Sequence, residues 1–269
     1  MWRQPAPDPM ASELRTERRD ATLLLTITDP ATRNALSEQV YAAGIEALNV
    51  AGDDDGIRCV VVQGDGADFC AGGDLQRLAR RREEDPSVQR TTIDRFAAFV
   101  DALRVCPKPV IASVEGAAAG GGFALALACD LIVAAEDARF VMSYGRVGLT
   151  PDGASSWHLL QALPRQLVAQ MVWLGEPFGA RQLHALGLVN WVTDSGAALT
   201  QALRIAVRLA ESAAPNALAD AKELLRSWPP LPMAEHLAAE REHFVDNLFH
   251  ANGAEGIRAF LDKRKPRFR

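Results

Sequence analysis

The chain has 269 residues, of which 48% are hydrophobic and 23% are charged, and this composition excludes a disordered or fibrous protein. Its net charge of −5 gives no global attraction to nucleic acid, so we expect no nucleic-acid partner. No uncharged apolar run reaches the roughly 18 residues of a membrane span, because Glu115, a glycine cluster and Asp130 interrupt the alanine-rich residues 110–135.

The cysteines lie in or beside apolar runs, and no two of them have the spacing of metal ligands. They are Cys59, Cys70, Cys106 and Cys129. We expect reduced, structural thiols, which suit a cytoplasmic protein. The first ten residues are rich in proline and lack the apolar stretch of a signal peptide.

Strands and helices are predicted to alternate over the first 190 residues, which favours an α/β fold. Strand-like runs cover Thr22 to Thr28, Cys59 to Val62, Val110 to Val114 and Leu131 to Ala134. Ser37 is the predicted N-cap of a first helix that ends near Gly52. A second helix, ended by Pro107, carries its apolar residues at helical spacing: Ile93, Phe96, Val100 and Leu103.

The pattern changes after Val192. From Ala197 onward the chain is predicted to form helices separated by breakers, which are Pro215, Pro229, Pro230, Pro232 and Gly253. We therefore divide the chain into a core, residues 1–195, and a helical C-terminal region, residues 196–269. Three histidines of this region, His236, His243 and His250, are seven residues apart, about two helical turns, which is too far to share a metal ion. No metal site is predicted.

Two glycine clusters are the main candidates for a functional site. One runs from Asp68 to Leu75 and the other from Glu115 to Phe123, and each lies between a strand and a helix. Glycines let a substrate approach the backbone closely, and the following helix offers free N–H groups and a partial positive charge. Together the clusters could hold an oxygen that becomes negative. A dinucleotide-binding turn fails because G-x-G-x-x-G would need glycine at Ala118, whereas tight turns of purely structural use stay possible.

Five segments, in order and over nearly the full chain, resemble those of the crotonase, or enoyl-CoA hydratase/isomerase, superfamily. They are PATRNALS (Pro30 to Ser37), FCAGGDL (Phe69 to Leu75), EGAAAGGGFALALACDLIVA (Glu115 to Ala134), ARFVMSYGRVGLTPDGASSWHL (Ala138 to Leu159) and AFLDKRKPRF (Ala259 to Phe268). The resemblance implies a spiral of ββα units followed by a helical trimerisation region. It also implies an acyl-CoA thioester substrate, a homotrimer or dimer of trimers, and no cofactor besides the coenzyme A of the substrate.

The resemblance further implies roles for single residues. The N–H groups of Gly73 and Gly121 would form the oxyanion hole for the thioester carbonyl, although the family usually has alanine or another small residue at the first position. The backbone around Ala35 and Ala71 would line the adenine pocket of CoA. Phe260 and Lys263 match tail residues that contact CoA, often from a neighbouring subunit, which would explain why five of the last seven residues are basic.

The catalytic residues depart from those of hydratases, which use two glutamates. The matching positions here are Ala124 and Tyr144, and neither side chain is a carboxylate. Asp152 resembles the single acid/base of the family's double-bond isomerases, so we expect an isomerase, with hydratase, hydrolase or an inactive CoA-ester-binding trimer as alternatives. Asp152 could also be only a helix N-cap. An apolar acyl pocket is expected to be bordered by Leu75, Leu78, Tyr144, Val147 and Trp157, and Glu115 is a reserve candidate for a pocket role.

Overall fold

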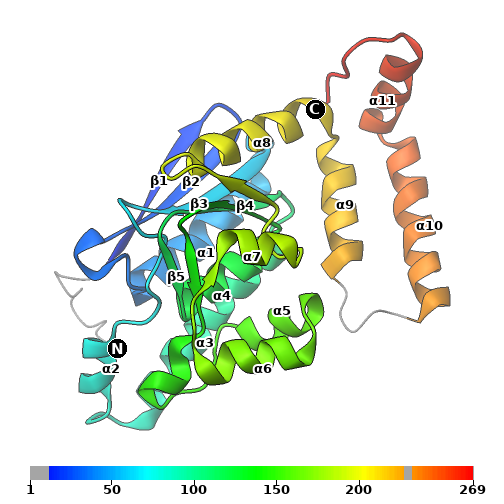
Figure 1. Cartoon of the computed structure of the whole chain (residues 1–269). Coiled ribbons are helices and arrows are strands. Elements are labelled where there is room, and N and C mark those ends of the chain that lie inside the picture. Colours follow the sequence, from blue (N-terminus) through cyan, green and yellow to red (C-terminus); the bar gives the residue numbers. More distant parts are fainter. Residues whose placement is uncertain (1–11, 227–231, 269) are drawn as a thin grey trace, which may run out of the picture.

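The computed structural model describes residues 12–226 and 232–268. The first ten residues, the predicted breakers Pro229 and Pro230, and the last basic residue, Arg269, lie outside the described residues. The fold is a mixed α/β architecture built on a mainly parallel sheet, as predicted (Figure 1).

The main sheet has six strands in the order β1-β2-β3-β4-β6-β9. These strands are β1 (Glu13–Arg19), β2 (Thr22–Thr28), β3 (Cys59–Gly64), β4 (Val110–Val114), β6 (Leu131–Ala135) and β9 (Trp191–Thr193). β1 pairs antiparallel with β2, and every other neighbouring pair is parallel. The four predicted strands are confirmed, with β2 and β4 at both predicted ends, whereas the charged edge strand β1 was not predicted.

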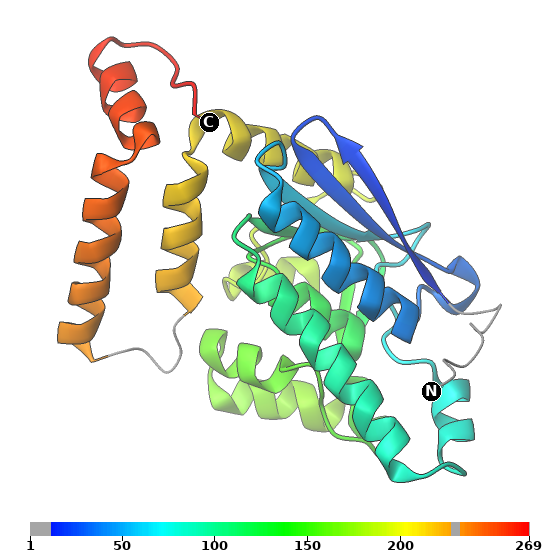
Figure 2. The ribbon, with the colours of Figure 1, turned by 180° about the vertical axis from the view of Figure 1, so that it is seen from behind.

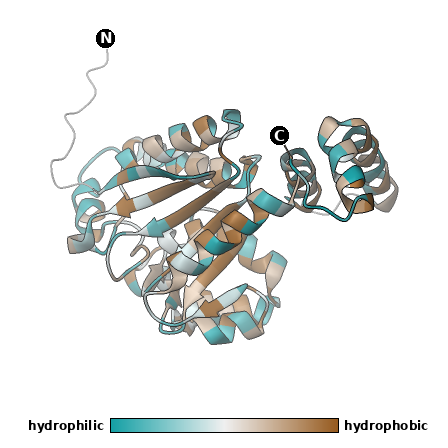
Figure 3. Ribbon diagram, turned by 90° about the horizontal axis from the view of Figure 1, so that it is seen from above, coloured by the Kyte–Doolittle hydropathy of each residue, from teal (hydrophilic) through white to brown (hydrophobic). Residues whose placement is uncertain are grey.

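Alternate residues of the central strands face opposite layers, because side chains of a strand point to opposite faces in turn. Leu24, Val61 and Ile111 pack against α8 (Ala198–Ser212). On the other face, residues such as Leu25 and Val62 pack in the larger core with α1 (Glu38–Asp53), α3 (Pro86–Val105) and α4 (Gly121–Ala128). α1 and α3 lie side by side (Figure 2), and the central strands are strongly apolar (Figure 3).

The predicted start of α1 is confirmed, since the Ser37 side chain accepts a hydrogen bond from the amide of Val40. A second sheet of three short strands was not predicted: β5 (Ala117–Ala119), β7 (Arg139–Val141) and β8 (Phe178–Gly179). β5 lies inside the second glycine cluster, where three alanines carry no strand signal in the sequence. The remaining short helices are η1 (Pro30–Thr32), α2 (Leu75–Arg81), η2 (Ser143–Val147), α5 (Ser155–Ala162), α6 (Arg165–Leu174) and α7 (Ala180–Ala185).

Three C-terminal helices project from the core (Figures 1 and 3): α9 (Pro215–Arg226), α10 (Met233–Phe249) and α11 (Ala251–Leu261). We call them the C-terminal arm. α9 is attached through Lys222, whose ammonium lies 2.7 Å from Asp130 Oδ2. The division of the chain at residue 196 stays a prediction, but α8, which follows it, packs on the sheet, so the projecting part begins only at Pro215.

The C-terminal arm carries the three spaced histidines. His236 and His243 lie on α10, whereas His250 follows that helix and accepts a hydrogen bond from the amide of Asn252. Within residues 12–226 and 232–268, no group of histidine, cysteine, aspartate or glutamate side chains is placed to hold a metal ion. In the same ranges, no helix has both the length and the apolar character that crossing a membrane requires.

Candidate active site

The two glycine clusters run side by side as paired backbone. The amide of Phe69 donates to the carbonyl of Glu115 (2.8 Å), and the amide of Cys70 donates to that of Ala117 (2.9 Å). In return, the amide of Ala119 donates to the carbonyl of Cys70 (2.9 Å). The two segments, more than forty residues apart in the sequence, are thereby fixed in one register.

A third segment, from the predicted CoA-side loop, completes this layer. The amide of Ala71 donates to the carbonyl of Arg33 (2.9 Å), and the amide of Leu36 donates to that of Gly72 (2.7 Å). The loop itself is organised by Asn34, which has a positive φ of 57° and whose side-chain amide donates to two carbonyls, Asp65 (2.9 Å) and Asp68 (2.8 Å). The structure therefore brings three of the five recognised segments together.

The closest approach between the clusters requires glycine. A β-carbon on Gly72 would lie 2.5 Å from the carbonyl oxygen of Ala119 and 2.9 Å from the amide nitrogen of Gly121, and the φ of Gly72 is +86°. Likewise, a β-carbon on Gly122 would lie 2.2 Å from the carbonyl oxygen of Cys70. Because these contacts are with backbone atoms, a larger residue could not be accommodated by moving a side chain.

The amides of Gly73 and Gly121 flank this approach, and both residues line one cavity of about 470 Å³. Gly121 is the first residue of α4, where a helix has free N–H groups and a partial positive charge. Neither amide makes a hydrogen bond to any residue that the structure describes. Gly73 is exposed at the cavity and Gly121 is buried beneath it.

The cavity also contains most of the other predicted substrate residues. These are Ala71, Leu75, Leu78, Tyr144, Val147 and Asp152. The wall formed by α1 and α3 is lined by four residues that were not predicted as site residues: Tyr41, Gln89, Ile93 and Phe96. The spacing of Gln89, Ile93 and Phe96 by four and three residues places them on one face of α3 and is the signal that could have found them.

Asp152 and Tyr144 form a hydrogen-bonded pair in this cavity. The Tyr144 hydroxyl donates to Asp152 Oδ1 at 2.6 Å. Burial raises the pKa of the Asp152 carboxyl above its usual range, although the hydrogen bond from Tyr144 acts in the opposite direction. Burial and the neighbouring Asp152 also raise the pKa of Tyr144, so the phenol keeps its proton and remains a donor.

The Asp152 side chain does not cap a helix. The N-cap of α5 is Ala154, and no side chain there accepts a hydrogen bond from the helix. Instead, the backbone carbonyl of Asp152 accepts from the amide (3.1 Å) and the hydroxyl (2.8 Å) of Ser155. The carboxylate is therefore left for the cavity.

The position that matches the first glutamate of hydratases is closed. Ala124 is fully buried, and a β-carbon on Gly153 would lie 3.0 Å from the Ala124 β-carbon and 2.4 Å from the Phe96 ring. The loop that carries Asp152 thus packs directly over Ala124. A carboxylate side chain has no space there in this arrangement.

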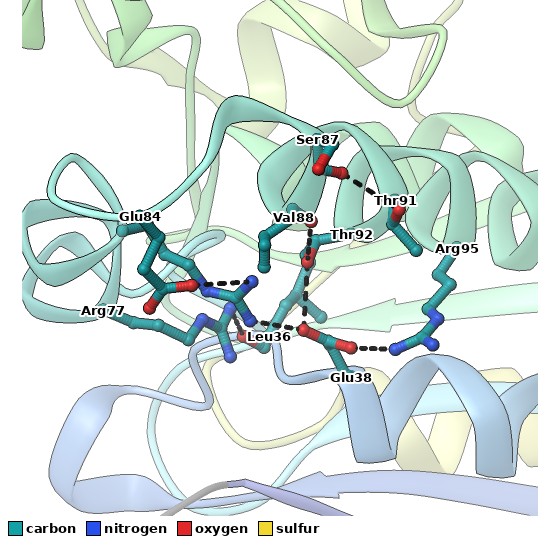
Figure 4. A network of polar contacts seen from close by, with 10 residues as sticks. Leu36, Glu38, Arg77, Glu84, Ser87, Val88, Thr91, Thr92 and Arg95 are labelled. Carbon is teal, nitrogen blue, oxygen red and sulfur yellow. Dashed lines mark hydrogen bonds and ion pairs between the residues drawn. The ribbon is translucent and has the colours of Figure 1, made fainter. Parts of the chain in front are cut away.

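Helix α2, which brings Leu75 and Leu78 to the cavity, is held by a polar network (Figure 4). Arg81 of α2 lies 2.6 Å from Glu38 Oε1 at the start of α1. Glu38 also accepts from the Thr92 hydroxyl of α3 (2.9 Å) and forms an ion pair with Arg95. Arg77 adds a hydrogen bond of 2.6 Å to the carbonyl of Leu36. Polar contacts to α1 and α3 therefore set the position of this cavity wall.

Several predicted residues lie outside the cavity of the single chain. The prediction for Trp157 differs from the structure: its ring packs against His158 and lies 6.0 Å from the guanidinium of Arg104, because the turn before α5 directs it toward α3. Phe260 and Lys263, at the end of α11, are exposed on the C-terminal arm. Ala35 is buried, and its carbonyl accepts a hydrogen bond from Ser12.

Glu115, the reserve candidate, has a structural partner instead. Its carboxylate accepts hydrogen bonds from the amides of Gly196 (3.0 Å) and Ala198 (2.9 Å) at the start of α8. The negative charge at this helix end is favourable. Its position directly before a glycine cluster gave no sign of this partner, which lies 81 and 83 residues further along the chain.

With this sheet, these interlocked glycine loops and this cavity, the chain is a crotonase-superfamily enzyme. It belongs to the enoyl-CoA hydratase/isomerase family, whose model matches residues 17–269, and the predicted resemblance is confirmed. It is 35% identical over 258 residues to 2,3-dehydroadipyl-CoA hydratase of Escherichia coli (strain K12), a match covering 96% of this chain and 99% of that protein. It is 33% identical over 251 residues to 1,2-epoxyphenylacetyl-CoA isomerase of the same organism, covering 91% and 94%.

A solved structure shows the same fold. The crystal structure of an enoyl-CoA hydratase from Polaromonas sp. JS666 superposes with a TM-score of 0.93 at 53% sequence identity, covering 96% of this chain and all of that one. The names of the similar proteins include both hydratases and an isomerase. The family acts on acyl-CoA thioesters.

Proposed function

We propose that the enzyme moves a carbon–carbon double bond along the acyl chain of an acyl-CoA thioester, with Asp152 as a single acid/base. The observation that carries the proposal is the composition of the cavity. Of the described residues that line it, Asp152 is the one carboxylate, and it faces the same cavity as the two free amides of Gly73 and Gly121. One carboxylate is sufficient for a reaction in which a single proton leaves one carbon and returns to another.

The reaction begins when the thioester carbonyl accepts hydrogen bonds from Gly73 and Gly121. These amides stabilise the negative charge that the oxygen gains when C2 loses a proton, and each such donor contributes about 3 kcal/mol. The ionised Asp152 takes the C2 proton of a 3-enoyl-CoA and gives it to C4. The double bond then lies between C2 and C3, and atoms and charge are balanced without water, oxidant or a further cofactor.

Tyr144 assists without changing its own protonation state. Because its hydroxyl binds Oδ1, the second carboxylate oxygen is the one left to exchange the proton with substrate. Burial raises the pKa of Asp152, which brings the carboxylate closer to the basicity that a general base needs at neutral pH.

Hydration is the second candidate, because similar proteins carry hydratase names. Addition of water across a double bond uses two carboxylates in the family's hydratases, as the resemblance implies. Here the matching positions are the enclosed Ala124 and the protonated phenol of Tyr144. This arrangement favours isomerisation.

The test is a product analysis with matched substrates. Purified enzyme is given 3-enoyl-CoA and, separately, 2-enoyl-CoA, and products are identified by mass spectrometry. The proposal expects conversion of the 3-enoyl to the 2-enoyl ester with no change in mass. A gain of one water from 2-enoyl-CoA indicates a hydratase, and free thiol indicates a hydrolase. Binding of CoA esters without any turnover would show an inactive binding protein, and each of these results contradicts the proposal.

We further propose that the enzyme works as a homotrimer or a dimer of trimers, in the cytoplasm. The C-terminal arm exposes large apolar side chains that a single chain leaves uncovered, among them Phe244 (70% exposed), Phe249 (83%) and Phe260 (83%). A neighbouring subunit would cover them, because several large apolar side chains exposed on one region of a protein favour an interaction site there. In that assembly Phe260 and Lys263 would contact the CoA bound to another subunit. The four cysteines are free and buried, as a reducing compartment allows.

A further inference from the structure

One wall of the cavity contains a hydroxyl that has no hydrogen-bond partner among the described residues. Tyr41 of α1 is only 5% exposed, and it lines the cavity. Its ring packs against Phe96 and Phe99 of α3, with centroids 5.3 and 6.4 Å away. These contacts fix the ring, and therefore the place of its hydroxyl.

The Tyr41 hydroxyl makes no hydrogen bond to any residue that the structure describes. Among the described residues, the fully enclosed side-chain polar atoms that lack a hydrogen-bond partner belong to Ser113, His158 and Thr193. Since the Tyr41 hydroxyl is not one of these, it reaches open space, and the space that Tyr41 lines is the cavity. Water can pair with this hydroxyl while the cavity is open, but an acyl chain that fills the cavity displaces the water and must supply the partner itself.

The surroundings limit what that partner can be. Leu36 and Phe96 make this part of the cavity apolar, and Asp152 is its only charged side chain among the described residues. Arg77 is close enough for its charge to act on Tyr41, but it is bound to the carbonyl of Leu36 and is not part of the lining. A carboxylate on the acyl group would therefore find no cation in the lining and would be repelled by Asp152. A neutral oxygen, such as a hydroxyl or a ketone, could pair with Tyr41 without either cost.

We propose that Tyr41 determines acyl specificity by hydrogen bonding a neutral oxygen group that the acyl chain carries beyond the thioester. The preferred substrates are therefore hydroxyacyl or oxoacyl thioesters of CoA. A plain alkyl chain of the same length fills the apolar part but leaves the Tyr41 hydroxyl unpaired. This inference rests on the proposed acyl-CoA site, although not on the direction of its reaction.

The test measures binding rather than turnover. Saturated CoA esters from butanoyl to octanoyl are prepared in three forms: plain, with a hydroxyl or keto group on the chain, and with a terminal carboxylate. Saturated esters have no double bond to move, so their affinities, measured by calorimetry, do not depend on the proposed reaction. Failure to isomerise 3-enoyl-CoA would overturn the proposed function and leave this comparison intact.

For at least one chain length, the neutral oxygenated ester is expected to bind about three- to tenfold more tightly than the plain ester. The ratio should fall to about one in Tyr41→Phe and persist in Thr91→Val, a control that removes a hydroxyl from α3 outside the lining. A ratio that persists in Tyr41→Phe would overturn the inference. So would plain esters that bind more tightly at every length, or carboxylate esters that bind best. If the Tyr41→Phe variant unfolds at a markedly lower temperature than the wild type, the affinity ratios measured with the wild-type protein alone decide.

Discussion

The hydroxyl of Tyr144 lies 2.6 Å from Oδ1 of Asp152, so the only carboxylate among the described cavity residues is already hydrogen-bonded before substrate arrives. The two residues are eight positions apart, on η2 and on the loop before α5. This pairing holds the carboxylate in one orientation. It also makes the basicity of Asp152 dependent on a neighbour that can be altered separately.

Replacing Asp152 by Asn is expected to lower kcat for isomerisation about 10²- to 10⁴-fold, because the amide cannot exchange the proton. The test is a rate measurement with 3-enoyl-CoA at saturation. Activity within a few-fold of wild type would contradict the assignment of Asp152 as acid/base.

The same variant is expected to be more stable than wild type at neutral pH. Burial raises the folded-state pKa of Asp152, so the stability linked to this group is fully present below its unfolded pKa and is lost as pH rises through the folded pKa. The introduced amide is neutral at every pH and avoids the cost of a buried charge, so the difference in melting temperature should shrink on acidification. A variant that is less stable at neutral pH would show that the carboxylate is a structural element.

Replacing Tyr144 by Phe removes the hydrogen bond that favours the ionised form of Asp152. The pKa of Asp152 should therefore rise further, and the acidic limb of the pH–rate profile should move to higher pH. We also expect kcat to fall about tenfold, since a hydrogen bond to a charged group is lost. An unchanged acidic limb would show that Tyr144 only lines the cavity.

The neighbouring glycines Gly72 and Gly73 should respond differently to alanine. In Gly72→Ala the new β-carbon would lie 2.5 Å from a backbone oxygen at a φ of +86°, which should lower the free energy of unfolding by about 2 kcal/mol or more. In Gly73→Ala it would meet only the Leu78 side chain, at 3.7 Å, and the change should stay within about 0.5 kcal/mol. Urea unfolding compares the pair, and equal losses would contradict the interlocked arrangement of the two loops.

Replacing Glu38 by Gln should loosen α2. Burial opposes the ionisation of Glu38, but Thr92, Arg81 and Arg95 outweigh it, so its pKa is lowered. The stability that Glu38 contributes is therefore present above its unfolded pKa and is lost as pH falls through the folded pKa. We expect the variant to have a free energy of unfolding about 1 kcal/mol below that of the wild type at neutral pH, and the difference should become smaller in acid. Thermal unfolding at several pH values measures this difference in stability. A difference that is the same at every pH would contradict the ionic role of Glu38.

Replacing Phe244 by Asp should dissociate the proposed assembly, because a charge is placed in apolar contact surface. Light scattering coupled to gel filtration should give the mass of three or six chains for the wild type and a lower mass for the variant. Val50→Asp, at an exposed apolar position of α1 on the core, is the matched control. A monomeric wild-type protein would refute the assembly.

Much of the fold could be predicted because buried strands carry strong local signals. β2 and β4 were predicted at both ends, since each is rich in apolar and β-branched residues and has a proline close to one end. β1 was not predicted because its sequence, ELRTERR, is that of a charged edge strand. No local pattern in the sequence shows its pairing with β2. The short strands β7 and β8 likewise depend on their partners rather than on propensity.

The backbone segments of the candidate site could be predicted from the sequence. The glycine clusters and the resemblance indicated Gly73 and Gly121, and the structure places both at one cavity. Side-chain directions were not predictable: the Trp157 ring lies away from the cavity, whereas Tyr41, on the core face of α1, reaches it. Such details depend on packing between elements that are distant in the sequence.

The contact of Glu115 with the start of α8 adds a polar link between the second glycine cluster and a helix that also packs on the main sheet. One unbroken stretch of backbone carries this carboxylate at one end and Gly121 at the other, and α8 leads directly into the C-terminal arm. A displacement of α8 would therefore reach, through the Glu115 carboxylate, the same backbone segment that places the amide of Gly121 at the cavity.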